Sequence, residues 1–111
     1  MLTLKTISTF TTRIDVVHPT GEESDFVGTF RYLTKPQLDQ LMASKPDDRA
    51  VVEAVLVGVS GVVDEHGEPV SFDVALPAIT DDIATTAACV QGFLRALGGA
   101  PAKNSKPSRP R

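Results

Sequence analysis

The sequence is poor in residues that anchor small proteins strongly. It has no tryptophan, one tyrosine and five phenylalanines among 111 residues, so its core must rest mainly on aliphatic packing. Its one cysteine, Cys89, excludes an internal disulfide and lies in an apolar helical pattern. That setting favours a small buried side chain over a reactive thiol. At 41% hydrophobic residues the chain is predicted to form one globular domain with a modest core.

The sequence also lacks a long uninterrupted apolar run. No segment is long enough to span a bilayer, and Lys5 and Arg13 break the residue order that a secretory signal would need. We therefore expect no membrane segment and a cytoplasmic protein.

Basic residues are scarce outside the C-terminal end. Residues 103–111 hold four of the eleven Lys and Arg, so the other 102 residues carry seven against fourteen Asp and Glu, a balance of −7. Such an acidic body argues against a surface that binds nucleic-acid phosphates. The end is rich in Pro and Ser and is predicted to be a disordered basic tail. A solubilising end is favoured over an arm for nucleic acid or a partner. The single domain is placed at residues 1–102.

Two segments alternate in the manner of half-buried strands. In 9–17 the even positions are Phe10, Thr12, Ile14 and Val16, and 26–33 repeats the pattern with Phe26, Gly28, Phe30 and Tyr32. The polar loop 18–24 joins them. The predicted class is α+β: an N-terminal two-stranded antiparallel hairpin packed on a small bundle of three to four helices, because a lone hairpin is barely stable in water.

Helix signals follow. Thr34 and Gln37 form a capping box with Pro36 in the first turn, Leu33 and Leu38 are spaced as a hydrophobic staple, and this helix is expected to end before Pro46. Residues 48–59 have a helical stripe and an acidic start at Asp47 or Asp48, but their valines favour strand. Propensity alone does not decide between the two, and the spacing favours helix.

The second half begins with a turn at Asp64-Glu65-His66-Gly67, which joins 62–63 to 69–70 as a tiny hairpin. Residues 72–79 are predicted to hold a single helical turn. The last helix is capped by Thr80 or Asp81 and ends at Gly98-Gly99. Its predicted buried stripe is Ile83, Ala87, Val90, Leu94 and Leu97.

Residues suited to chemistry are few. The acidic turn lacks the spacing of a calcium loop, and His18 and His66 have no companions for zinc, so neither a metal site nor a cofactor is expected. Ser60 lies near two glycines without the spacing of a hydrolase nucleophile elbow. We therefore expect a protein that acts by contact and is not an enzyme.

Two stretches carry a resemblance to a known family. They are Phe26-Val27-Gly28-Thr29-Phe30-Arg31-Tyr32-Leu33-Thr34, and the run from Val57 through Gly58-Val59-Ser60-Gly61-Val62 and the acidic turn to Pro69-Val70-Ser71-Phe72. Together they resemble the tail assembly chaperones of long-tailed, siphovirus-type bacteriophages and prophages, over about 14–104. Val59 stands where that family usually has a tryptophan.

The resemblance implies a function. A tail assembly chaperone would bind the tape measure protein, a long, aggregation-prone helical chain, and shield its apolar surface until tail-tube subunits polymerise around it. It implies a homo-oligomer, a ring or spiral with head-to-tail contacts, in the host cytoplasm. The tail-tube protein is a further expected partner. The alternative is a minor structural tail or head-tail joining protein of the virion.

Four apolar residues are candidates for partner binding: Val59, Phe72, Leu76 and Phe93. For each, burial in the core is the favoured interpretation. Phe93 is the best external candidate, because it falls off the centre of the predicted stripe of the last helix.

Overall fold

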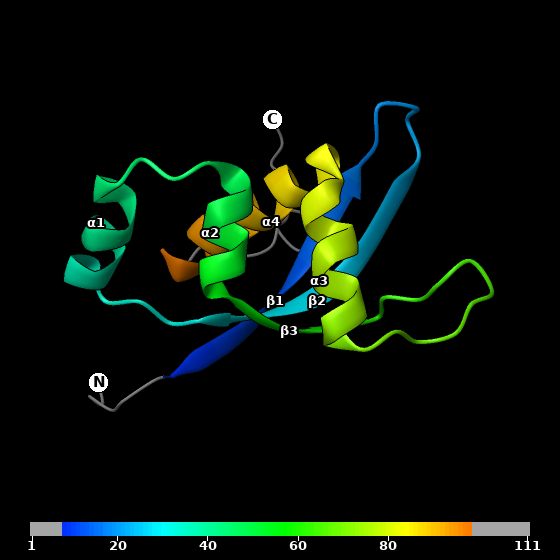
Figure 1. The fold of residues 1–111 in the computed structure, drawn as a ribbon, viewed down its shortest axis with the longest axis horizontal. Coiled ribbons are helices and arrows are strands. Elements are labelled where there is room, and N and C mark those ends of the chain that lie inside the picture. The colour runs from blue at the N-terminus through cyan, green and yellow to red at the C-terminus, as the bar shows by residue number, and fades with distance from the viewer. Residues whose placement is uncertain (1–7, 99–111) are drawn as a thin grey trace, which may run out of the picture.

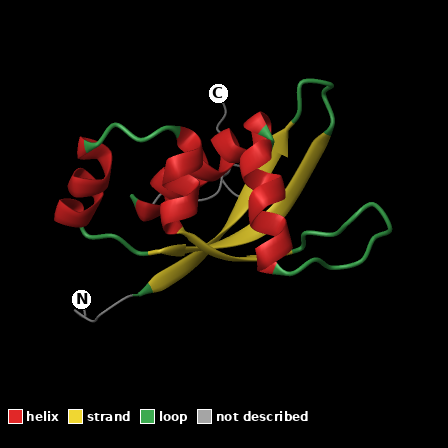
Figure 2. Ribbon diagram, viewed as in Figure 1, coloured by secondary structure: helices red, strands yellow, loops and turns green. Residues whose placement is uncertain are grey.

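The computed structural model describes residues 8–98, and the predicted basic tail lies outside this range. The class is α+β, as the sequence predicts, with a three-stranded antiparallel sheet and four helices in the described part. Figure 1 shows α1 standing apart from the other helices, at the side of the molecule. Figure 2 shows α2 and α3 side by side across the sheet.

The predicted hairpin is confirmed. Strands β1 (Thr9–Val17) and β2 (Glu23–Arg31) pair antiparallel from Thr9 opposite Arg31 to Val17 opposite Glu23. The alternation predicts the faces correctly: Ile14, Val16, Phe26 and Phe30 are buried under the helices. The opposite face carries exposed residues such as Thr11, Arg13 and Val27, and no described helix covers it.

The prediction for 48–59 is half wrong. Helix α2 covers Asp48–Val55, with Asp47 as its cap (Asp47 Oδ1 accepts from the N–H of Ala50 at 2.8 Å). The chain then extends as β3 (Leu56–Ser60), which pairs antiparallel with β2. The predicted two-stranded sheet is therefore three-stranded. The hydrogen-bonding edge of β2 stabilises the extended conformation of a valine-rich segment, and pairing between distant segments cannot be read from local periodicity.

Helix α1 (Lys35–Ala43) begins as predicted. The side chain of Thr34 accepts from the N–H of Gln37, whose Oε1 in turn accepts from the N–H of Thr34 at 2.9 Å. The helix buries no residue completely, although Leu38, Leu41 and Met42 pack against the rim of the core.

Residues 72–79 form more than a single turn. They belong to α3 (Phe72–Asp81), a ten-residue helix that includes Pro77. This helix contacts β3 and the helices α2 and α4. Before it, the predicted small hairpin is present: Val63 bridges to Pro69, and Gly67 has a positive φ of 80°.

The stripe predicted for the last helix is partly wrong: Val90 and Leu97 pack against the core as predicted, but Ile83 and Leu94 are exposed. Helix α4 (Ile83–Leu97) is capped by Asp82, and it buries Thr86, Cys89, Gly92 and Phe93. Ile83, predicted to be buried, is 86% exposed. The reason is a close approach to the sheet: a Cβ on Gly92 would lie 2.6 Å from Cδ1 of Ile14, so a larger residue at this position would force the Ile14 side chain to move.

Candidate functional site

The predicted partner-binding residues occupy two kinds of environment. Phe93 is fully buried, and its ring centroid lies 5.9 Å from that of Phe10 and 5.4 Å from that of Phe30. It is the centre of the aromatic core, so its selection as the best external candidate is wrong. The error follows from the wrong phase of the α4 stripe.

Val59, Phe72 and Leu76 are half-buried and pack against the core. They lie on β3 and α3, which contact each other. Each side chain is partly exposed to solvent, and its buried part packs against the core. The contribution of these three residues to partner binding stays a prediction.

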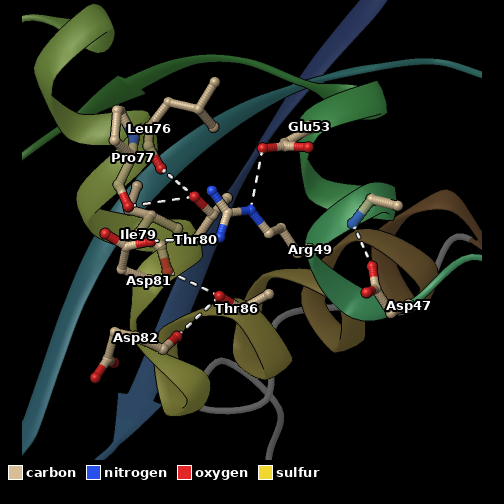
Figure 3. A network of polar contacts seen from close by, with 11 residues as sticks. Asp47, Arg49, Glu53, Leu76, Pro77, Ile79, Thr80, Asp81, Asp82 and Thr86 are labelled. Carbon is tan, nitrogen blue, oxygen red and sulfur yellow. Dashed lines mark hydrogen bonds and ion pairs between the residues drawn. The ribbon is translucent and has the colours of Figure 1, made fainter.

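A network of polar groups joins α2, α3 and α4. Figure 3 shows Arg49 reaching from α2 between Glu53 on its own helix and Asp81 at the end of α3, at 3.3 and 3.4 Å. Thr86 Oγ1 lies 2.8 Å from both the Ile79 and the Asp82 carbonyl oxygens, and its single hydroxyl hydrogen can be donated to either of them. These contacts satisfy groups left over at helix ends, so the network is structural.

Three side chains near the hairpin loop line up as in a hydrolase. Ser24 Oγ lies 3.4 Å from His18 Nε2, and His18 Nδ1 lies 3.8 Å from Asp82 Oδ2. The second distance is too long for a hydrogen bond. The same Asp82 oxygen already accepts from the N–H and the hydroxyl of Thr85, which lower the pKa of Asp82. The carboxylate is therefore committed to capping α4 and does not orient the imidazole for proton transfer.

The thiol and the acidic residues offer little chemistry. Burial raises the pKa of Cys89 to about 12, which keeps it protonated and unreactive. Within 8–98, no three His, Cys, Asp or Glu side chains converge into a possible metal site. None of the helices in the described range has the length and apolar character needed to cross a membrane.

One hollow with a largely apolar lining lies between α3 and the end of the hairpin. We call it the α3 groove. Its volume is about 380 Å³, and it is lined by Val16, Ser24, Asp25, Phe26, Gly61, Val62, Val63, Ala75, Ala78, Ile79 and Thr85. Most of these are apolar, and the α3 side of the groove is formed largely by alanine. Small side chains there leave the space open.

Exposed apolar side chains surround the α3 groove. Val63, one of its lining residues, is 55% exposed, and Val74, on the outer side of α3, is 60% exposed. With the exposed Pro77 and Ala78, α3 has an unusually apolar outer surface for a surface helix. Sequence reasoning missed this surface because it predicted a single turn at 72–79 and therefore assigned no outer face.

The charge around the groove is mainly negative. Residues 50–94 contain seven Asp and Glu and no Lys or Arg. They include the acidic turn and the whole of α3. At the hairpin end, Asp25 is paired with Arg13 at 2.7 Å, whereas Glu22 and Glu23 form no salt bridge with any described residue. The groove is thus apolar inside and set in a negative surface.

Comparisons with protein-family models, with curated proteins and with solved structures find no match for this chain. The family named above therefore rests on the two sequence stretches alone.

Proposed function

We propose that this protein is a phage tail assembly chaperone, which binds the tape measure protein and shields its apolar surface during tail morphogenesis. It acts by reversible contact, with no catalytic step and no cofactor. It works in the host cytoplasm as a homo-oligomer arranged in a ring or spiral. The tail-tube protein is a second partner in the same proposal.

The α3 groove is the observation that carries the proposal. An exposed apolar hollow with further exposed valines beside it is the type of surface that binds other proteins. Its negative surroundings keep such a surface soluble when it is empty. A chaperone needs both properties, because it must bind apolar segments of its client without aggregating itself.

The modest size of the groove favours a multivalent mode of action. A hollow of about 380 Å³ can hold only a few side chains, so one copy would bind weakly. Several copies lined up along one long client would bind it together far more strongly than any single copy. This is a physical reason for the proposed oligomer.

Co-expression with the tape measure protein tests the proposal. We expect the tape measure protein to be insoluble alone and to co-purify as a soluble complex with this chain. The Ala78→Phe variant, which fills the groove from an exposed position on α3, should reduce the soluble complex. Ala54→Phe adds the same ring to an exposed alanine of α2 that does not line the groove, and it is the matched control. If the tape measure protein stays insoluble with the unmodified chain, the proposal is wrong.

The alternative, a minor structural tail or head-tail joining protein, makes the opposite prediction for finished particles. A chaperone leaves before the tail is complete. Quantitative mass spectrometry of purified virions should therefore find it absent or far below one copy per particle. A constant whole number of copies in every particle would favour the structural role.

A further inference from the structure

The third strand of the sheet is shorter than its neighbour. Strand β2 pairs with β1 over its whole length, from Glu23 to Arg31, but it pairs with β3 only from Val27 to Phe30. The chain leaves the sheet after Ser60, at Gly61, whose φ of 82° turns it away. The β3-side edge of residues 23–26 therefore has no partner strand among the described residues.

The α3 groove lies directly at this unpaired edge. Ser24, Asp25 and Phe26 of β2 line it, together with Val62 and Val63 just beyond the end of β3. In Figure 1, β2 and the segment after β3 diverge on the side where α3 crosses in front of them. The groove thus lies where β3 would run if the strand were longer, and α3 forms its wall on the helical side of the sheet.

The unpaired edge and the groove together have the features needed to bind an extended chain. An edge of a strand offers backbone N–H and C=O groups, and successive side chains of an added strand point alternately to the two faces of the sheet. Side chains on one face would enter the groove against the exposed Ala78 and the edge of Ile79. Those on the other face would lie on the open side of the sheet.

Charge selects among extended chains. Glu22 and Glu23 lie at this end of the hairpin, and Asp64 and Asp73 lie on the segments that flank the groove in sequence. None of these four forms a salt bridge with a described residue. A segment that alternates apolar and basic residues would complement both the groove and its surroundings.

We propose that the α3 groove binds an extended, cationic segment of a partner protein, which adds to the sheet as a strand beside Glu23–Phe26 and continues the line of β3. The inference rests on the proposed function for the identity of the natural partner, a segment of the tape measure protein held before it becomes helical. The binding mode itself rests on the register of the sheet. Strand addition combines backbone hydrogen bonds with side-chain pockets.

A peptide that does not come from any phage tests the binding mode separately from the function. The probe is a fluorescein-labelled octapeptide of alternating valine and lysine, and the readout is fluorescence anisotropy with the full chain. We expect saturable binding that weakens as salt is raised. An octapeptide of alternating valine and glutamate should bind at least about tenfold more weakly.

Backbone methylation distinguishes strand addition from simple charge attraction. Two probes carry N-methyl groups on either the valines or the lysines, so that each blocks one edge of the peptide. Strand addition predicts that one of the two loses binding and the other keeps it. Equal binding of both, at the affinity of the unmethylated probe, would overturn the proposal.

Variants of the protein locate the binding surface. Ala78→Phe should weaken probe binding by about tenfold or more, and Ala54→Phe by less than about twofold. Circular dichroism and urea unfolding of both variants confirm that they fold. Equal effects of the two substitutions, or failure of the unmodified chain to bind the lysine probe, would refute this mode. The co-expression result would then still decide the proposed function.

Discussion

Helices α4 and α3 both pack on the same sheet, but they do so in different ways. The face of α4 that meets the sheet is closed, because Phe93, Phe10 and Phe30 form a cluster of three rings in mutual contact and Gly92 lies against Ile14. Helix α3 covers the sheet with Ala75 and Ile79, and it leaves a groove beside it and Val74 exposed on its outer side. The comparison indicates that α4 provides stability and that α3 provides a surface for contact.

The largest effect is expected from the aromatic core. Phe93→Ala should lower the free energy of unfolding by about 3–5 kcal/mol, because it removes a buried ring that packs on two others. Urea unfolding measures this change. A loss below about 1 kcal/mol would show that α4 is not the stabilising element.

A smaller loss is expected where α4 approaches β1. Gly92→Ala should destabilise the fold by about 1–3 kcal/mol, since the added Cβ would lie 2.6 Å from Ile14 Cδ1. Ile14→Val removes that atom. The double variant should therefore lose less unfolding free energy than the sum of the losses in the two single variants. Strict additivity in this double-mutant cycle would contradict the close contact.

The junction between the two helices has a smaller, pH-dependent effect. Asp82→Ala should cost about 1 kcal/mol at neutral pH, because it removes the cap of α4. Hydrogen bonds from Thr85 hold the pKa of Asp82 below its ordinary value of 3.8 in the folded state. The stabilisation is therefore fully present above 3.8 and is lost as pH falls through the lowered pKa.

Unfolding of both proteins across the acidic range checks this sign. The gap between the unmodified chain and Asp82→Ala should close toward low pH. Asp39→Ala, which breaks an exposed pair with Lys35, is the control and should cost no more than about 0.5 kcal/mol. A gap that widens on acidification would exclude the capping role.

The smallest effect on stability is expected on the outer side of α3. Val74→Asp should change the free energy of unfolding by no more than about 0.5 kcal/mol, because the side chain is 60% exposed. The measurement is again urea unfolding, alongside Phe93→Ala. A loss of several kcal/mol would mean that α3 is as firmly packed as α4, and the contrast between the helices would fail.

The sequence predicts well the elements whose signals are local. The alternation in β1 and β2 identifies both faces of the hairpin, and the Thr34–Gln37 capping box identifies the start of α1. These patterns depend on residues that are close together in the chain, and contacts between distant segments are not needed to recognise them.

The errors lie where distant contacts decide. Residues 56–60 are extended because β2 offers them an edge, and their own spacing does not show it. The buried face of α4 contains a threonine, a cysteine and a glycine, since a close approach to β1 selects small residues over the larger aliphatic ones. The local patterns do not predict the groove, because it depends on the short β3 and on the full length of α3, and neither of these was predicted.

Hydrogen exchange of the complex with the tape measure protein tests the central claim most directly. The account predicts that complex formation slows exchange at the amides of Glu23–Phe26 and of α3, with little change in the core face of α4. Protection confined to α1 or α4, or no change at the hairpin end and α3, would contradict the claim that this protein works through the groove beside α3.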